Sequence, residues 1–225
     1  MSKRIALYGG TFDPVHRGHI AVAHGLSKIF ALDEVVLIPA YVAPHKRVKG
    51  VTPALHRYAM LALATQAEPG LRVSTIELDA PERPFTFETL TLVREKLGDE
   101  TQLFFIMGAD SWMEITTWRE WEKVLGLSNH IVVTRPGYDL SAEHVTPAVR
   151  ARIVDLRGGQ EKEQAAAIID ESDRIRIYVT DAVNMDVSAT AIRQAVRENR
   201  EADWLKDVHP AVADYIRKYG LYREA

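Results

Sequence analysis

Short runs of aliphatic and β-branched residues alternate with longer amphipathic stretches along most of this chain. A run of the first kind followed by a stretch of the second is typical of a βα unit. The pattern predicts strands over residues 3–8, 34–38, 71–78, 102–107, 129–134 and 174–180, and helices over residues 18–30, 52–66, 86–96, 118–125, 189–197 and 211–218. Because consecutive βα units cross over with the same hand, they build a parallel sheet with helices on both faces. We therefore expect an α/β fold with a doubly wound parallel sheet.

The organisation of the chain favours a single domain over residues 1–225. Neither a repeat of fixed period nor a Pro-, Ser- or Gln-rich linker marks a domain boundary. Residues 141–173 depart from the βα pattern, because 147–156 and 161–171 both look helical and Gly158-Gly159 separates them. We interpret 141–173 as a helical insertion and assign it no function.

Composition excludes several classes of protein. The 225 residues contain no cysteine, which rules out a disulfide scaffold, thiolate zinc sites, cysteine-held iron–sulfur clusters and a cysteine nucleophile. The formal net charge is −3, from 28 Lys and Arg against 31 Asp and Glu. Proteins that bind the backbone of nucleic acids need a concentrated excess of basic residues, so we expect no nucleic-acid partner.

No segment has the character of a targeting or membrane-spanning sequence. Only residues 5–8 separate the basic start of the chain from Gly9-Gly10, too few for the apolar part of a signal peptide. The longest strongly apolar stretches, such as 103–107, are far shorter than the roughly 20 residues that cross a bilayer. We expect a soluble, cytoplasmic protein with no membrane partner.

One segment contains the residues that most clearly indicate a binding site. It follows the first predicted strand, leads into the first predicted helix and reads GGTFDPVHRGH over residues 9–19. Ligands bind at the carboxyl ends of the strands in sheets of this kind. His16 and His19 are three residues apart, which places both imidazoles on one face of a helix start, near free backbone N–H groups and the positive end of the helix dipole. Because histidine can donate to phosphate as a neutral ring or as a cation, the pair is suited to hold an anion.

This segment resembles the (T/H)xGH signature of the nucleotidyltransferase superfamily, and its full form is similar to that of the nicotinate-nucleotide adenylyltransferase family. A second stretch, 187–193, reads VSATAIR and resembles the superfamily's ISSTxIR signature, from which it departs at its first and third residues. Ser188 and Thr190 are residue types that cap a helix and leave its N–H groups for phosphate. Arg193 offers a forked donor one turn further on.

Further matches follow in the same chain order and extend the resemblance over nearly the whole chain. They are Ala43-Pro44-His45-Lys46 for the family's PPHK loop, Pro84 to Leu90 for its SYTxxTL stretch, Gly108-Ala109-Asp110 for GxD, Trp118 for a downstream Trp, Arg135-Pro136-Gly137 for RPG, and Pro210 to Tyr222 for the closing PxxVxxYIxxxGLY. Residues 141–173 are the part of the chain that the resemblance covers least.

The resemblance implies a Rossmann-like fold and an enzyme of NAD biosynthesis. Such an enzyme transfers the adenylyl group of ATP to nicotinate mononucleotide and gives deamido-NAD and pyrophosphate. The residues implied are His16 and His19 for catalysis; Gly9, Gly10, Thr11, Phe12, Gly108, Asp110, Ser188, Thr190 and Arg193 for ATP; and His45, Lys46, Thr86, Trp118 and Arg135 for nicotinate mononucleotide. No cluster of carboxylates suggests a metal held by the protein, so we expect Mg²⁺ to arrive with ATP.

Several alternatives compete with this interpretation. A dinucleotide-dependent oxidoreductase needs GxGxxG after the first strand and a P-loop kinase needs GxxxxGK[ST], and the chain meets neither pattern. A phosphopantetheine-using relative typically has Thr in place of the first histidine, so His16 argues against it. A nucleotide sensor without turnover is disfavoured because His19, Lys46 and Arg193 are also retained. A preference for nicotinamide over nicotinate, the oligomeric state, and a plain helix-capping role for Asp110 stay open.

Overall fold

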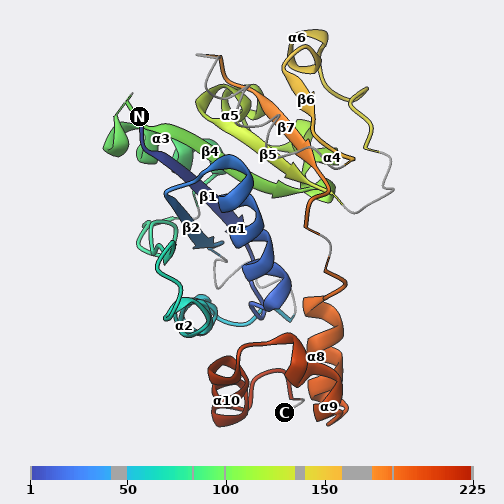
Figure 1. Ribbon diagram of the computed structural model, residues 1–225. Helices are drawn as coiled ribbons and strands as arrows, with labels where there is room; N and C mark the ends of the chain where they lie inside the picture. The colour runs from blue at the N-terminus through green and yellow to red at the C-terminus, as the bar shows by residue number, and fades with distance from the viewer. Residues whose placement is uncertain are drawn as a thin grey trace. The chain divides into compact units, whose positions relative to one another are not determined.

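The computed structural model describes residues 2–41, 50–82, 84–98, 100–134, 140–158, 174–183 and 185–223. Strands and helices alternate along most of the chain, as the sequence predicts (Figure 1). In chain order they are β1 (Arg4–Gly10), α1 (Arg17–Phe30), β2 (Glu34–Pro39), α2 (Ala54–Thr65), β3 (Leu71–Val73), α3 (Thr86–Leu97), β4 (Gln102–Gly108), α4 (Ala109–Met113), η2 (Ile115–Thr117), α5 (Trp121–Leu127), β5 (Asn129–Val133), α6 (Pro147–Arg150), β6 (Ile153–Asp155), β7 (Ile177–Thr180), α8 (Ala189–Arg197), α9 (Glu201–Trp204), η3 (Leu205–Asp207) and α10 (Pro210–Tyr219). None of the described helices has the length and apolar character that a membrane crossing requires.

The described strands form one seven-stranded sheet in the order β3-β2-β1-β4-β5-β7-β6. β1 pairs with β4 in parallel, with Tyr8 opposite Ile106, and the parallel ladder continues from β4 through β5 and β7 to β6. From β1 the chain builds the sheet outward through β2 and β3 on one side, and from β4 it builds the other side. The strand order therefore reverses between β1 and β4. Ligands of such sheets bind beyond the carboxyl ends of the strands at this point.

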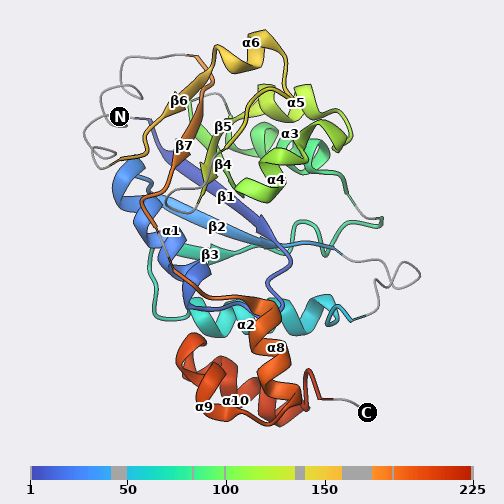
Figure 2. The ribbon, with the colours of Figure 1, turned by 90° about the vertical axis from the view of Figure 1, so that its right-hand side faces the viewer.

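Helices cover both faces of the sheet, which confirms the predicted doubly wound α/β fold (Figure 2). Neighbouring residues of a strand point to opposite faces. On β4, the ring centroid of Phe104 lies 6.0 Å from that of Phe30 on α1, whereas the ring of Phe105 lies 6.4 Å from that of Trp118. Both phenylalanines are buried. α1 thus packs on one face, while α3 and α5 pack together on the other.

The chain divides by its contacts into two compact units. The first unit comprises Met1–Gly9, His24–Val36 and Pro84–Asn184, and the second unit comprises Gly10–Ala23, Leu37–Arg83 and Met185–Ala225. The first unit holds most of the sheet with α3, α4 and α5. The second unit holds the loop between β1 and α1 together with α2, α8, α9 and α10. The assignment of residues 1–225 to a single nucleotidyltransferase domain stays a prediction.

The structure corrects the prediction for residues 147–156. Helix α6 covers only the first turn of this stretch, and residues 153–155 form strand β6 instead of continuing a helix. Ile153 pairs with Ile177 on β7, so the ladder of the sheet decides the conformation of a segment too short to show a strand period. Residues 159–173, the rest of the predicted insertion, lie outside the described residues.

Other predicted elements are shorter than expected, among them the strand over 174–180, which begins only at Ile177 as β7. Strand β3 ends at Val73, because the chain turns at Thr75, whose carbonyl oxygen accepts the N–H groups of Leu78 and Asp79. The helix predicted over 118–125 begins only at Trp121. The preceding residue, Glu120, adopts a left-handed conformation with φ of 53°, which a right-handed helix cannot include. Neither turn has a glycine or proline to mark it in the sequence.

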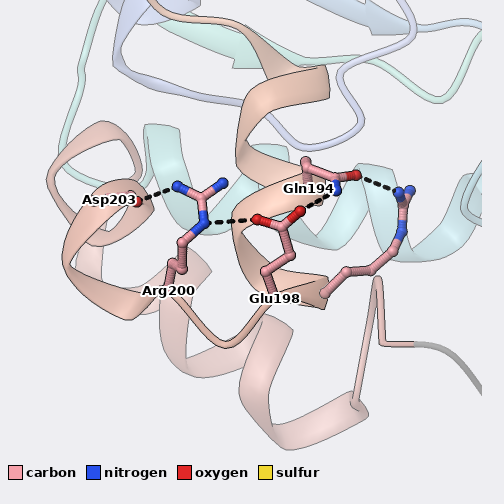
Figure 3. Close-up of polar contacts among 5 residues, drawn as sticks. Gln194, Glu198, Arg200 and Asp203 are labelled. Carbon is pink, nitrogen blue, oxygen red and sulfur yellow. Dashed lines mark hydrogen bonds and ion pairs between the residues drawn. The ribbon is translucent and has the colours of Figure 1, made fainter.

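Exposed polar contacts join the end of α8 to α9 (Figure 3). Glu198 accepts hydrogen bonds from Gln194 on α8 and from Nε of Arg200, the latter at 2.7 Å. Arg200 also donates to Asp203 on α9. All four side chains are exposed, so solvent screens these contacts and we expect little stability from them. We call these four residues the α8–α9 surface network.

Candidate active site

The loop between β1 and α1 places the two histidines against each other. His16 precedes α1, and its carbonyl oxygen accepts the backbone N–H groups of His19 at 3.0 Å and Ile20 at 3.4 Å. These bonds start the helix and bring the two imidazoles into a stack, with ring centroids 3.7 Å apart and planes inclined by 24°. The predicted placement of both imidazoles on one face of the helix start is confirmed.

Hydrogen bonding and burial fix the protonation of this pair. The backbone N–H of His16 donates to Nδ1 of His19 at 3.2 Å, so the proton of the neutral His19 ring is on Nε2. Burial lowers the pKa of His16 to about 4. Burial, together with the nearby His16, also lowers the pKa of His19 well below its ordinary value. At neutral pH both rings are therefore uncharged, and each carries one N–H that can donate to an anion.

Gly18, Gly10 and Phe12 shape the loop around the histidines. A Cβ on Gly18 would lie 3.0 Å from Nδ1 of His16, so a side chain there would displace the ring. Phe12 has a left-handed φ of 49° and buries its ring edge-on against His19, with centroids 4.9 Å apart. A Cβ on Gly10 would lie 3.0 Å from the ring of Phe12. Two residues predicted to bind ATP, Gly10 and Phe12, thus support the loop that carries the histidines.

Helix α8 lies beside this loop in the second unit. Its N-cap is Ser188, whose Oγ accepts the N–H of Ala191 at 3.4 Å, which confirms the predicted cap. One turn on, Nη2 of Arg193 donates to Oγ1 of Thr190 at 3.3 Å. Nη1 of Arg193 donates to the main-chain oxygen of Asp13 at 2.6 Å. The structure thus joins the second signature to the histidine loop.

Glycines end two neighbouring strands in the first unit. Gly9 is near the carboxyl end of β1, and Gly108 is the last residue of β4. A Cβ on Gly9 would make only an ordinary contact, 3.5 Å from the ring of Phe105. Gly108 is the N-cap of α4 and no side chain caps this helix, so the capping role left open for Asp110 is wrong. The Asp110 side chain instead is exposed in the first turn of α4.

Two residues predicted to bind the pyridine nucleotide also lie in the first unit. Thr86 is the first residue of α3, so its N–H belongs to the turn that has no acceptor inside the helix. Trp118 follows η2 in an extended conformation, with its ring edge-on to Phe105. The backbone N–H of Trp118 donates to the carbonyl of Ile115 at 3.0 Å and is therefore already engaged.

Cation–π contacts join the segments that carry Thr86 and Trp118. The guanidinium carbon of Arg119 lies 4.7 Å from the ring centroid of Phe85, and Nζ of Lys123 lies 5.0 Å from that of Phe87. Contacts of this kind contribute about 0.5–1 kcal/mol at exposed sites. They hold the start of α3 to the chain that enters α5.

The remaining predicted residues fall into two groups. His45, Lys46 and Arg135 lie outside the described residues. Thr11 is exposed, and its carbonyl oxygen accepts a hydrogen bond from Arg57 at 2.7 Å. Within the described part of the chain, no three His, Asp or Glu side chains gather as metal ligands.

Comparison with known proteins decides the family. The profile of the cytidylyltransferase-like family matches residues 7–195. The chain is 34% identical over 221 residues to a protein of Thermoanaerobacter sp. (strain X514), covering 98% of this chain and 95% of the relative. It is 37% identical over 219 residues to a protein of Laribacter hongkongensis, covering 97% and 94%. Both relatives are named as probable nicotinate-nucleotide adenylyltransferases. The chain belongs to the nicotinate-nucleotide adenylyltransferase family.

Solved structures support the fold of this adenylyltransferase family member. A Plasmodium falciparum nicotinic acid mononucleotide adenylyltransferase complexed with NaAD superposes with a TM-score of 0.70 at 21% identity, and the match covers 98% of this chain and 97% of that one. The same protein complexed with APC gives a TM-score of 0.69. The predicted Rossmann-like α/β fold is confirmed. The family consists of ATP-using nucleotidyltransferases.

Sequence reasoning missed three residues that hold the histidine loop of this adenylyltransferase family member. They are Asp13, which belongs to the loop itself, and Arg57 and Tyr222, which contact the loop from distant parts of the chain. Asp13 lies in the GGTFDPVHRGH segment, but the sequence indicates no separate role for it. Arg57 gives one weak signal in the sequence, because its spacing to the apolar residues Met60 and Leu61 places it on their face of the helix. In the structure it is fully buried.

Proposed function

We propose that this chain transfers the adenylyl group of ATP to nicotinate mononucleotide and releases deamido-NAD and pyrophosphate. The observation that carries the proposal is the stacked, neutral His16–His19 pair, joined through Asp13 to Arg193 in a member of this family. The NaAD bound by the Plasmodium neighbour is the dinucleotide that this reaction would form. We place the reaction in the cytoplasm, where ATP is supplied.

The reaction is an in-line displacement at phosphorus. A phosphate oxygen of the mononucleotide attacks the α-phosphorus of ATP, the bond from that phosphorus to the β-phosphate oxygen breaks, and pyrophosphate leaves with the electron pair. The protein has to align two anions that repel each other and to neutralise the charge that builds on the leaving group. The N–H groups of His16 and His19 and the guanidinium of Arg193 would do this, and no covalent intermediate is needed.

The remaining ATP contacts follow the family resemblance. We assign Gly9, Gly10, Thr11 and Phe12 to the phosphate loop, Ser188 and Thr190 to the start of α8, and Gly108 and Asp110 to the ribose and adenine side. The donors at this site are the imidazoles of the histidine loop and the guanidinium of Arg193 on α8, which suit phosphate oxygens and not Mg²⁺. Mg²⁺ would therefore be carried by the phosphates of ATP and would screen their charge.

The mononucleotide is assigned to Thr86 and Trp118 of the first unit and to His45, Lys46 and Arg135. Trp118 would stack on the pyridine ring. The carboxylate of nicotinate needs hydrogen-bond donors, and the first-turn N–H groups of α3 at Thr86 can supply them. The N–H of Trp118 is engaged by Ile115, so it does not contribute. A carboxamide carries no negative charge for a helix N-terminus to stabilise, which would favour nicotinate.

Pyrophosphate release by the purified protein tests the proposal. ATP and Mg²⁺ are held constant while nicotinate mononucleotide, nicotinamide mononucleotide and phosphopantetheine are compared as acceptors. We expect strong preference for the nicotinate form. Equal use of both pyridine nucleotides would keep the reaction and overturn the carboxylate argument, and no release with any acceptor would support a nucleotide sensor instead.

Replacing Trp118 by alanine tests the stacking role. Stacking of a base on an aromatic ring contributes about 1–3 kcal/mol, so we expect the KM for nicotinate mononucleotide to rise roughly tenfold or more while the KM for ATP changes little. Trp121→Ala, which alters the first residue of α5, is the matched control. Equal increases for both substrates would contradict the stacking role.

A further inference from the structure

The histidine loop itself contains a buried carboxylate, in the second unit. Asp13 is only 4% exposed. Its Oδ1 accepts the hydroxyl of Tyr222 at 2.7 Å, and its Oδ2 accepts the backbone N–H of Thr52 at 3.0 Å. A buried charge without partners is costly, so a carboxylate in this position depends on these two donors. Tyr222 is the side chain that supplies one of them.

A fully buried arginine completes this arrangement. Arg57 donates to the carbonyl oxygens of Thr11 at 2.7 Å, Ala40 at 2.7 Å and Thr52 at 2.9 Å. Burial lowers the pKa of Arg57, and the negative charge of Asp13 opposes that shift. The guanidinium thus fastens the histidine loop to two other segments of the unit. We call Asp13, Arg57, Arg193 and Tyr222 the Asp13 cluster.

One member of the Asp13 cluster, Arg193, is assigned to bind phosphate. The main-chain oxygen of Asp13 accepts Nη1 of Arg193 at 2.6 Å, and His16 follows Asp13 by three residues. The side chain of Asp13 therefore fixes the position of the carbonyl that holds Arg193. Burial and the charge of Asp13 also raise the pKa of Tyr222, so its hydroxyl keeps its proton and remains a donor.

We propose that Tyr222 is a positioning residue for adenylyl transfer, which holds Arg193 and the histidine loop in place through the carboxylate of Asp13. The inference rests on the proposed function. Without the hydroxyl, Asp13 loses a donor that water cannot easily replace, and its carbonyl is free to shift away from Arg193. Displacing a phosphate ligand by about 1 Å can cost on the order of 10²-fold in rate, so the effect falls on kcat.

Tyr222→Phe tests the proposal because it removes one hydroxyl and keeps the ring. Tyr215→Phe is the matched control, since that hydroxyl bonds Nδ1 of His56 at 3.0 Å in the same unit and does not contact Asp13. We expect Tyr222→Phe to lower kcat about tenfold or more, with the KM for nicotinate mononucleotide within about twofold. We expect Tyr215→Phe to keep the wild-type kcat. Equal kcat values in the two variants would overturn the inference while leaving the proposed function intact.

A double-mutant cycle with Arg193→Ala separates positioning from general loss of stability. If Tyr222 acts through Arg193, the losses in kcat are not additive, because the second change removes a group already displaced. Independent losses would overturn the proposal. The side-chain N–H signals of Arg193 in NMR spectra give a readout that does not need turnover. They should move in Tyr222→Phe and stay in Tyr215→Phe, and unchanged signals in Tyr222→Phe would overturn the inference even if the protein proved inactive with every acceptor.

Discussion

Helix α8 takes part in two sets of polar contacts of very different kinds. Arg193, in the middle of the helix, belongs to the Asp13 cluster, in which Asp13 is 4% and Arg57 0% exposed. Gln194, the next residue, belongs to the α8–α9 surface network, which joins it to Glu198, Arg200 and Asp203 in exposed positions (Figure 3). Both regions contain arginines bonded to oxygen atoms at short distances. Their hydrogen bonds alone do not distinguish them.

Burial is what separates the two regions. A polar group that has lost its water must keep every protein partner, because a lost partner leaves an unsatisfied group behind. An exposed group that loses its partner is hydrated again. The Asp13 cluster is therefore sensitive to single substitutions, and its hydrogen bonds hold the loop that carries His16 and His19. The surface network tolerates change, and within the described part of the chain its hydrogen bonds involve neither histidine.

The largest expected effect is that of Arg57→Met. The change removes a buried cation, strands the carbonyls of Thr11, Ala40 and Thr52, and leaves Asp13 without its counter-charge. A buried polar group left without its partner costs about 1–3 kcal/mol, and three carbonyls lose their donor here, so we expect the free energy of unfolding to fall by roughly 3 kcal/mol or more. Urea denaturation measures it.

Arg57→Lys separates the contribution of the positive charge from that of the three hydrogen bonds. Lysine keeps the charge but is a single point donor and cannot reach three carbonyls with a rigid fork. We expect its stability to lie between those of the wild type and Arg57→Met. If both variants unfold at the wild-type midpoint, the buried cluster contributes no more than the surface network and the comparison fails.

The second-largest effect is expected from acid, which should lower the free energy of unfolding through the buried histidine loop. The pKa of His16 is about 4 in the folded protein against about 6.5 in an unfolded chain, so between these values the unfolded state binds more protons. Stability is therefore fully present above pH 6.5 and is lost as the pH falls toward 4. At about 1.4 kcal/mol per pH unit, the loss from this residue is about 3 kcal/mol.

Urea midpoints measured at pH 7.5 and pH 4.5 for the wild type and His16→Gln test this prediction. The variant cannot take up the proton, so it should lose less stability on acidification. His19 and His130 remain in both proteins, and because burial lowers the pKa of each, they supply the loss that the two proteins share. Identical losses would show that His16 is not the buried titrating group described here.

The smallest effect is expected from Arg200→Ala. This change removes both contacts of Arg200 with Glu198 and Asp203, in a region where every side chain of the network is exposed. Exposed ion pairs often contribute nothing measurable. We expect an unchanged urea midpoint and an unchanged kcat. A clear loss of either would mean that the surface network acts on the site and that burial is not the deciding difference.

The sequence predicts what depends on local pattern. The apolar run of β4, the cap at Ser188 and the histidine spacing at the start of α1 are all local, and the structure confirms them. Strand β6 was wrongly predicted as helix, because its three residues show no period and its conformation depends on pairing with β7. The short helices α4 and α9 were not predicted, because they too have too few residues to show a period.

The sequence could not predict the Asp13 cluster, because its members are far apart in the chain. Tyr222 is 209 residues from Asp13, and Arg57 is 46 residues from Thr11. A lone arginine in an amphipathic helix ordinarily indicates a solvated face. Its burial here depends on carbonyls that only the folded chain brings together. The family resemblance identified the residues assigned to substrates. Its matched stretches include Asp13 and Tyr222, but it gave no sign that these two residues position the others.

The most direct test of the account is the kcat for pyrophosphate release from ATP and nicotinate mononucleotide, compared among the wild type, His16→Ala and His19→Ala. We predict that each variant keeps its circular dichroism spectrum and loses on the order of 10²-fold or more in kcat, because each imidazole stabilises charge that develops in the transition state. His209→Ala, which alters the N-cap of α10, should keep the wild-type kcat. A wild-type kcat in either His16→Ala or His19→Ala would contradict the account and remove that histidine from catalysis.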